Sequence, residues 1–216
     1  MEKNSREITS DQEGVHGDLL YLVEKYVNNH YLKPIQNHNK EAFVNILSII
    51  QDDEELPILD SCCGTGMSSF KLAERFPERR VIGIDQSAKR LSKQASKNEQ
   101  VVLVRANCED LWRLFVQHDI KFYRHCIFYP NPWPKSEHLK RRWHGHPVFP
   151  VLKQLSEQIE VRSNWRTYVE EFAIAWQALT SNTGDLMEFR ATENMTLFEK
   201  KYQESGQPLY RFEAKS

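Results

Sequence analysis

Short apolar runs alternate with helix-like segments through the middle of this 216-residue chain, and this alternation limits the possible folds more than any other feature. The runs cover residues 57–60, 81–85, 101–106, 123–129 and 159–162. Helices are predicted near 67–76, before Pro77, and near 87–97, where Ser87 can cap the first turn. Short strands that alternate with helices indicate a mostly parallel sheet covered on both faces. We therefore predict an α/β fold with a doubly wound, mostly parallel sheet.

The chain length favours one large domain, and we divide it accordingly. Residues 1–14 are predicted to form a disordered tail, and residues 15–216 a single domain. Apolar residues at helical spacing predict a helical extension within 19–27 and 43–50, divided at Pro34. A further helix is predicted over 168–179, and the segments 186–190 and 209–213 are predicted to close the sheet as a pair of strands.

Charge and cysteine content exclude several classes of protein. The 29 basic and 30 acidic residues give a net charge of −1, which excludes a globally basic nucleic-acid binder but leaves room for a local basic patch. No apolar run approaches the roughly 18 residues of a membrane span, and we expect no secretory signal. The four cysteines form no C-x-x-C pair. We expect a reduced, cytoplasmic protein without a structural metal and without a membrane partner.

A glycine-containing turn follows the first predicted strand, where ligands bind in sheets of this kind. The strand ends at Asp60, and Cys62, Gly64 and Gly66 lie in the turn before the next helix. Asp85 ends the second strand, where a carboxylate can bind ribose hydroxyls. The turn is not G-x-G-x-x-G, and an acid ahead of it repels phosphate but suits a cation. S-adenosylmethionine, with its amine, sulfonium and ribose, fits this pattern, and the alternative is an ordinary strand–turn–helix.

Asn107 follows the third predicted strand, where its side chain could meet the adenine of such a cofactor. The alternative role is that of an ordinary turn residue.

A stiff, basic segment follows the fourth predicted strand. It reads Tyr129-Pro-Asn-Pro-Trp-Pro-Lys135 and continues to Trp143 with four basic residues against one acid over 135–142. Three prolines in five residues stiffen the loop and can preorganise Asn131 and Trp133 against a planar substrate. Cations that hold phosphate beside an aromatic ring are typical of nucleic-acid binding. The alternative is a solvated basic helix after a proline turn.

The P-N-P-W-P-K-x-x-H-x-K-R-R segment resembles the TrmB family of tRNA (guanine-N7)-methyltransferases, whose hallmark is P-D-P-W-P-K. The likeness continues in R-S-N-W at 162–165 and in T-x-F-E at 196–199, and it covers residues 20–213 in order. It implies a class I, Rossmann-like, S-adenosylmethionine-dependent methyltransferase with a tRNA partner. The product would be N7-methylguanine in the tRNA variable loop.

The resemblance also assigns roles to particular positions. The cofactor would be bound by Asp60, Cys62, Gly64, Gly66, Asp85 and Asn107. Asn131 would stand at the catalytic position, and Lys135, Asn164, Thr196 and Glu199 would contact guanine or tRNA. His138, Lys140, Arg141 and Arg142 would lie along the RNA backbone.

The chain departs from the family pattern at three places. Cys62 occupies the first glycine of the D-x-G-C-G-x-G loop, which we expect to be tolerated only with a negative φ. The glycine pair before the fifth strand is absent, and 156–158 reads Ser-Glu-Gln. Asn131 stands where the family has aspartate.

The chemistry of guanine N7 bears on the asparagine. N7 carries no hydrogen, so its methylation requires no general base, and orientation with electrostatic fit supplies most of the acceleration. We expect Asn131 to retain positioning at a reduced rate, with Glu199 able to supply negative charge. Two alternatives remain open. One is an N-methyltransferase for a planar amine of adenine or glutamine, working through the Asn131-Pro-Trp-Pro134 loop. The other is a non-catalytic protein that binds the cofactor or tRNA.

Overall fold

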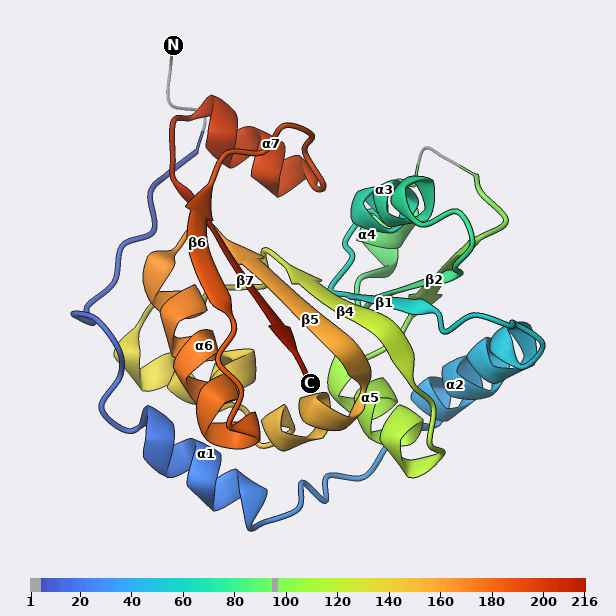
Figure 1. The fold of residues 1–216 in the computed structure, drawn as a ribbon, viewed down its shortest axis with the longest axis horizontal. Helices are drawn as coiled ribbons and strands as arrows, with labels where there is room; N and C mark the ends of the chain where they lie inside the picture. The colour runs from blue at the N-terminus through green and yellow to red at the C-terminus, as the bar shows by residue number, and fades with distance from the viewer. Residues whose placement is uncertain (1–4, 95–96) are drawn as a thin grey trace. The chain divides into compact units, whose positions relative to one another are not determined.

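The computed structural model describes residues 5–94 and 97–216, and it confirms the α/β prediction. Seven strands form one sheet in the order β3-β2-β1-β4-β5-β7-β6 (Figure 1). The described chain divides into two compact units. Unit 1 contains residues 5–32, 129–153 and 160–216, and unit 2 contains 33–94, 97–128 and 154–159.

Unit 2 is built on four parallel strands. They are β1 (Ile58–Ser61), β2 (Val81–Asp85), β3 (Val101–Arg105) and β4 (Phe122–Phe128). Their register places Asp60 beside Gly83 of β2 and Cys126 of β4, and β2 pairs with β3 in the same direction. Because the strands are parallel, their carboxyl ends share one edge of the sheet, where loop residues from different strands can gather.

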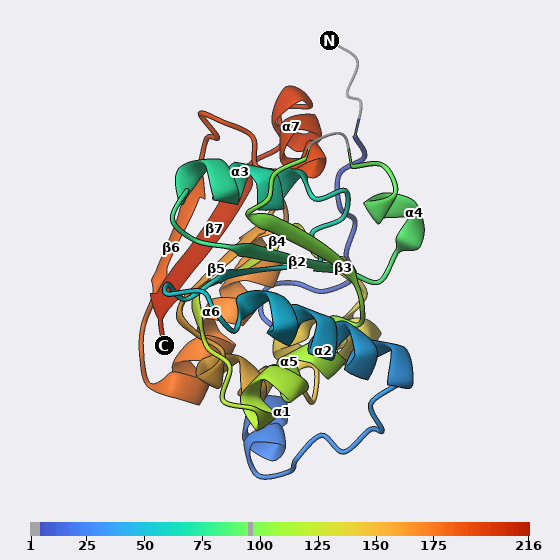
Figure 2. The same ribbon diagram turned by 90° about the vertical axis from the view of Figure 1, so that its right-hand side faces the viewer.

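Helices cover both faces of this part of the sheet, as Figure 2 shows. Helix α3 (Met67–Arg75) lies on one face, and α2 (Asn37–Ile50) and α5 (Cys108–Gln117) lie on the other. Strand residues such as Ile58, Leu59 and Ile82 are fully buried as a result. Apolar burial on both faces explains why these strands read as continuous apolar runs.

Unit 1 contains the end of β5 (Ser156–Ser163) and the antiparallel pair β6 (Asp185–Phe189) and β7 (Leu209–Lys215). Helix α6 (Arg166–Thr180) packs on β7 and on α1 (Leu19–Val27) (Figure 1). Phe172 and Trp176 of α6 stack in the core, and Phe172 also meets Phe212 of β7. Helix α7 (Leu197–Glu204) precedes β7.

The stiff basic segment of unit 1 folds into short 3₁₀ turns rather than an α-helix. They are η1 (Ser136–Arg141), η2 (Trp143–Gly145) and η3 (Phe149–Gln154). The alternative of a regular solvated basic helix is therefore wrong for this segment.

The predicted strands and long helices are confirmed, with boundaries that differ by three residues or fewer except at the start of α2, which begins at Asn37 rather than near Phe43. The helix predicted over 87–97 is much shorter, since α4 covers only Ala88–Leu91, and residues 95–96 lie outside the described residues. Ser87 does cap α4, because its Oγ accepts a hydrogen bond from the Arg90 N–H. Helices α5 and α7 were not predicted.

The domain assignment of residues 1–14 and 15–216 stays a prediction. Residues 5–16 contain no helix or strand, and residues 1–4 lie outside the described residues.

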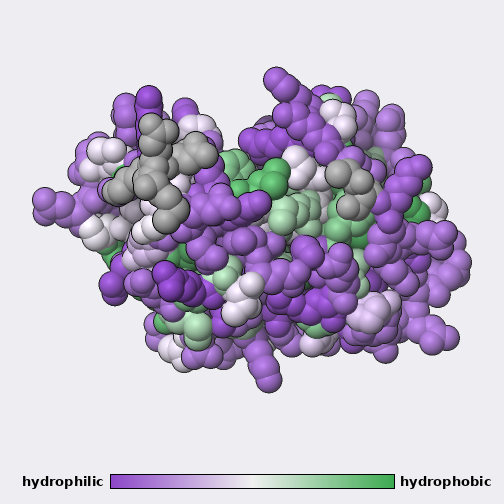
Figure 3. All heavy atoms as spheres, turned by 90° about the horizontal axis from the view of Figure 1, so that it is seen from above, coloured by the Kyte–Doolittle hydropathy of each residue, from purple (hydrophilic) through white to green (hydrophobic). Residues whose placement is uncertain are grey.

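Among the described residues, no helix is both long enough and apolar enough to span a membrane. On the face drawn in Figure 3, hydrophilic side chains cover most of the visible surface.

Candidate functional site

The loop between β1 and α3 in unit 2 has an unusual backbone. Cys62, Gly64 and Gly66 all have left-handed φ values, of 63°, 62° and 82°. A Cβ at Gly66 would lie 2.5 Å from Leu103 Cδ1, so that position requires glycine. At Gly64 the nearest atom to a Cβ is Arg90 Cδ at 4.0 Å, which leaves the loop backbone open to a ligand on that side.

The structure contradicts our expectation for Cys62. We expected a side chain there to require a negative φ, but Cys62 adopts a φ of 63°. A left-handed L-residue costs about 1–2 kcal/mol, so the loop holds backbone strain at this position. The geometry that the neighbouring glycines adopt at no steric cost is imposed on Cys62 by its surroundings.

Asp60 is a fully buried carboxylate with one unused oxygen. Its Oδ2 accepts hydrogen bonds from Ser68 Oγ at 2.6 Å and Ser69 Oγ at 2.7 Å. Its Oδ1 is buried and has no hydrogen-bond partner among the described residues. Burial, assisted by the charge of Asp85, raises the pKa of Asp60 to about 6 despite the two serine hydrogen bonds. A cationic donor at Oδ1 would satisfy this oxygen and stabilise the ionised form.

Asp85 holds the glycine loop in place. Its Oδ2 accepts the Gly64 N–H at 3.0 Å and lies 3.4 Å from Arg90 Nη1, and its Oδ1 accepts the Ser87 N–H at 2.7 Å. Asp85 is buried, whereas the Arg90 side chain is 55% exposed and can move away from the carboxylate. Asp85 therefore connects the ends of β1 and β2, and it keeps acceptor capacity for further hydroxyl donors.

Asn107 precedes α5 with an extended backbone, and its side chain does not cap the helix. Its backbone N–H donates to Asn39 Oδ1 at 3.0 Å, so Asn39 of α2 fixes the turn. The Cys62 and Cys108 sulfur atoms lie 4.0 Å apart, which brings the loop after β1 against the turn that contains Asn107. Unit 2 thus gathers all six predicted cofactor residues around the ends of β1, β2 and β3.

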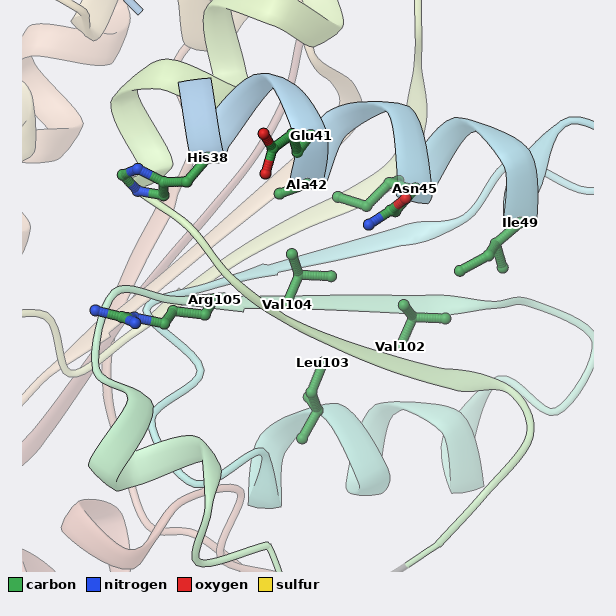
Figure 4. A pocket seen from close by; sticks show the side chains of 10 residues that line it. His38, Glu41, Ala42, Asn45, Ile49, Val102, Leu103, Val104 and Arg105 are labelled. Atoms are coloured by element: carbon green, nitrogen blue, oxygen red, sulfur yellow. The ribbon is translucent and has the colours of Figure 1, made fainter. Parts of the chain in front are cut away.

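A separate groove in unit 2 is lined by none of these six residues. It has a volume of about 400 Å³ and lies between α2 and the edge strand β3. Figure 4 shows Val102 and Val104 pointing toward α2, while Leu103 points to the opposite face, as strand alternation requires.

Arg142 organises the basic segment of unit 1 from the inside. Its side chain is fully buried and pairs with Glu171 Oε2 at 2.6 Å. The same nitrogen, Nη1, also donates to Gln12 Oε1 at 3.0 Å, while Nε and Nη2 donate to the carbonyl oxygens of Trp133 and Lys135, both at 3.1 Å. The guanidinium therefore fixes the loop backbone on both sides of Pro134.

This burial corrects the expectation that Arg142 lies along the RNA backbone. A phosphate cannot reach a guanidinium that is enclosed and already hydrogen-bonded to protein groups. Lys135, Lys140 and Arg141 are exposed, and the Arg141 guanidinium stacks over the Trp133 ring at 4.6 Å. His138 is half-buried and meets the same ring edge-on at 5.5 Å.

Glu171 is the anionic partner of a buried network. His144 Nε2 lies 2.8 Å from Glu171 Oε2, and burial lowers the pKa of His144, so it donates to Glu171 as a neutral imidazole. Burial opposes the charge on Glu171, but the hydrogen bonds from His144 and Arg142 and the positive charge of Arg142 outweigh it and lower the pKa of Glu171 to about 2.

The segment Ser10–His16, here called the N-terminal strap, joins this network. Its contacts are Ser10 Oγ to the Pro134 carbonyl (2.6 Å), Ser136 N–H to Asp11 Oδ1 (2.8 Å), Gln12 Nε2 to Glu171 Oε1 (2.6 Å) and His16 N–H to Glu171 Oε1 (2.9 Å). The strap thus holds both the loop and the carboxylate that orients Arg142.

Asn131 lies exposed in the loop that Arg142 fixes. Its Oδ1 accepts only a long contact of 3.4 Å from the Trp133 N–H, so the amide remains available to a ligand. Trp133 has a φ of 46° and Tyr129 a φ of 50°, both in the left-handed region. Strained residues on both sides of Asn131 are typical of a preorganised site.

The Thr196–Glu199 motif forms a helix cap. Thr196 Oγ1 accepts the Glu199 N–H at 2.9 Å, and Glu199 Oε1 accepts the Met195 N–H at 2.9 Å, in the manner of a capping box. Glu199 is fully buried and also accepts from Tyr129 Oη at 2.8 Å and from Arg162 Nη1 at 3.1 Å. The exposure expected of a guanine ligand at Glu199 is therefore absent, and its charge is already paired.

Asn164 also has a protein partner, since its Nδ2 donates to Gln207 Oε1 at 2.8 Å. Its direct contact with substrate stays a prediction.

Sequence reasoning missed Tyr129, Arg162 and Glu171 as supports of the loop. Burial, together with the charge and hydrogen bond of Glu199, raises the pKa of Tyr129, which keeps its hydroxyl a hydrogen-bond donor. The Thr-x-x-Glu spacing of 196–199 was a visible sign of a cap, whereas the partners of Glu171 are remote in sequence and left no local sign.

No group of three metal-binding side chains is found in residues 5–94 and 97–216.

Comparison with known proteins identifies the family. The family model described as "Putative methyltransferase" matches residues 54–212. A tRNA (guanine-N(7)-)-methyltransferase from Streptococcus thermophilus is 30% identical over 166 residues, which cover 70% of this chain and 77% of that protein. The chain belongs to the TrmB methyltransferase family.

Other TrmB relatives are similar at lower identity. The tRNA (guanine-N(7)-)-methyltransferase of Staphylococcus haemolyticus is 27% identical over 76% of this chain and 82% of its own length. That of Brevibacillus brevis is 26% identical over 70% of this chain and 77% of its own length.

Solved structures share the fold of this TrmB chain. An antibiotic-related methyltransferase has a TM-score of 0.60 at 18% identity, covering 81% of this chain and 94% of that chain. The 16S rRNA methyltransferase KamB has a TM-score of 0.59 at 14% identity, covering 85% and 94%. At these identities the likeness shows the fold alone, which is that of the class I, Rossmann-like, S-adenosylmethionine-dependent methyltransferases.

We expect Arg142→Ala to destabilise the protein far more than Lys140→Ala. Removal of Arg142 leaves the buried Glu171 carboxylate without its main partner, which costs about 3 kcal/mol of unfolding free energy. Lys140 is exposed, and its replacement should change stability by less than about 0.5 kcal/mol. Chemical denaturation measured at pH 7 compares the two variants, and equal stability would contradict the structural role of Arg142.

Proposed function

We propose that this TrmB chain transfers the methyl group of S-adenosylmethionine to N7 of a guanine in the variable loop of tRNA. The observation that carries the cofactor assignment is the loop after β1, with its open backbone at Gly64 and the unused buried oxygen of Asp60. The tRNA assignment rests on the relatives named as tRNA (guanine-N(7)-)-methyltransferases. A tRNA substrate and the three thiols at Cys62, Cys63 and Cys108 favour a cytoplasmic enzyme.

The residues of unit 2 suit each part of the cofactor. Asp60 Oδ1 would accept from the methionine ammonium, Asp85 would accept from the ribose hydroxyls, and Asn107 would meet the adenine. When bound, S-adenosylmethionine supplies an electrophilic methyl group on a positively charged sulfonium. Gly64 would let the cofactor approach the loop backbone, since it has no side chain to move aside.

The residues of unit 1 suit a guanine substrate and an RNA backbone. Asn131 would orient the base through its exposed amide. An amide suffices at this position because no proton has to be removed from N7, so no general base is needed. Lys135, Lys140 and Arg141 would bind phosphates, a role in which exposed cations release counterions. Glu199 would act indirectly, by holding Tyr129 and the start of α7, and not by contact with the base.

Methyl transfer to unmodified tRNA tests the proposal directly. We expect the purified protein to form N7-methylguanine from labelled S-adenosylmethionine, identified by nucleoside mass spectrometry. Methyladenine, or a methylated glutamine in a protein substrate, would favour the planar-amine alternative. Cofactor binding without any methylated RNA would favour the non-catalytic alternative and would contradict the proposal.

We expect Asn131→Asp to raise kcat about fivefold. An aspartate replaces a neutral acceptor by a charged one beside a base that becomes cationic, which adds about 1 kcal/mol of transition-state stabilisation. Single-turnover methylation at saturating tRNA measures the effect, with Asn131→Ala as the control that loses positioning. A variant slower than the wild type would show that the asparagine N–H donors are themselves needed.

Cofactor affinity should weaken as the pH falls through the pKa of Asp60. In the protein without cofactor, the Asp60 carboxyl has a pKa of about 6 and is mostly protonated below pH 6. Binding of the cofactor ammonium requires the ionised carboxylate. Raising the pH from 5 to 7 should therefore tighten binding about tenfold. Calorimetry across this range measures the change, and Asp60→Asn should bind weakly with little pH dependence. The same pH dependence in Asp60→Asn would exclude Asp60 as its origin.

A further inference from the structure

Two cysteines from different parts of the sequence meet beside the proposed cofactor loop. Cys62 Sγ and Cys108 Sγ lie 4.0 Å apart, although 46 positions separate the residues. Cys62 begins the loop that contains Gly64, and Cys108 is the first residue of α5, directly after Asn107. Both residues belong to unit 2, and both are free thiols.

The strained backbone makes Cys62 a costly residue for a purely structural role. Its φ of 63° is one that glycine adopts freely, and any L-residue there costs about 1–2 kcal/mol. What the cysteine adds, compared with glycine, is a thiol in contact with Cys108. The contact with a second thiol is thus the chemical feature that the loop gains at this position.

The four thiols differ in their access to an oxidant. Cys62 is the only one of the four that is not buried, since Cys63, Cys108 and Cys126 are all buried. The hydrogen bond with Cys62 and burial raise the pKa of Cys108, so Cys108 stays a thiol until a neighbouring sulfur reacts. An oxidant from solvent therefore meets Cys62 first, with Cys108 next to it.

We propose that Cys62 and Cys108 form an oxidation site at which hydrogen peroxide converts the two thiols into a disulfide. Cys62 attacks the peroxide, the O–O bond breaks, and Cys62 becomes a sulfenic acid with release of water. The Cys108 sulfur then attacks the sulfenic sulfur, the S–O bond breaks, and a second water leaves with the Cys108 proton. In total two thiols lose two electrons and two protons, and one hydrogen peroxide becomes two waters.

The disulfide would weaken cofactor binding, a consequence that rests on the proposed function. A disulfide requires the two sulfurs to approach from 4.0 Å to about 2.05 Å. That movement pulls the start of the glycine loop toward the turn that contains Asn107. Because Gly64 and Asn107 are both proposed cofactor contacts, we expect the dissociation constant of S-adenosylmethionine to rise at least tenfold.

Peptide mapping of the full-length protein tests the disulfide itself. After treatment with hydrogen peroxide, a non-reducing tryptic digest should contain the 41–71 peptide joined to the 106–113 peptide, with loss of two hydrogens, and dithiothreitol should reverse the link. Cys62 and Cys63 share the first peptide, so Cys62→Gly and Cys63→Ser decide which one reacts. The link should disappear in Cys62→Gly and Cys108→Ser and persist in Cys63→Ser. A link that persists in Cys62→Gly, or no link in the wild type, would overturn the proposal.

Cofactor binding by the reduced and the oxidised form of each protein tests the consequence. We expect the oxidised wild type to lose affinity at least tenfold and to recover with dithiothreitol. The ratio between the two forms should be close to one in Cys62→Gly. An equal loss in Cys62→Gly would overturn the effect on binding. A reduced wild type that binds no S-adenosylmethionine would instead contradict the proposed function, while the peptide map still decides the disulfide.

Discussion

The buried ion pair between Arg142 and Glu171 is the interaction on which the organisation of unit 1 depends. An unpaired charge in the interior costs several kcal/mol, so each donor of the guanidinium must find a partner. Two of those partners are carbonyl oxygens of the Asn131 loop, and a third is Gln12 of the N-terminal strap. Because the buried Arg142 guanidinium must be hydrogen-bonded, it fixes the positions of the Trp133 and Lys135 carbonyl groups in the loop. Among the described residues the Asn131 side chain accepts only the long contact from the Trp133 N–H, yet it can be held in position because the backbone on its carboxyl side is fixed.

The Thr196–Glu199 motif also uses a buried charge to support the structure of unit 1. Its charged residue is turned inward, where it caps α7 and holds Tyr129 and Arg162. A charged residue within a sequence motif can therefore support the fold rather than contact a ligand. The loop after β4 and the basic segment expose the Asn131 amide and the Lys135, Lys140 and Arg141 cations, and the Trp133 indole is partly exposed. These are groups that bind by orientation and by charge, which agrees with a reaction that needs no proton transfer.

The fold could be predicted from the sequence wherever burial is periodic. Strands covered on both faces read as apolar runs, and α6 shows its core face at helical spacing. Helix α5 was not predicted although Leu111, Leu114 and Phe115 lie at helical spacing, and only the short turn at 106–107 separates it from β3. In the site, Asp60, Gly64 and Asp85 could be placed because parallel strands end at one edge. The burial of Arg142 could not be predicted, because its partner Glu171 is remote in sequence. A segment with four cations over 135–142 has the local composition of a solvated surface.

Two free-energy costs are concentrated in the loop that follows β1. Asp60 has a buried oxygen without a partner, and Cys62 has a left-handed backbone that its side chain disfavours. Neither cost is relieved by a contact within the described residues, and both lie within three positions of each other. A cationic ligand that donates to Asp60 would offset the first cost and would therefore stabilise unit 2 when it binds. The second cost has no such relief from a ligand, because it resides in the backbone. In return for this strain, the Cys62 side chain places a thiol against Cys108. One loop therefore combines a carboxylate that needs a cationic partner, at Asp60, with a redox-sensitive thiol contact two residues later.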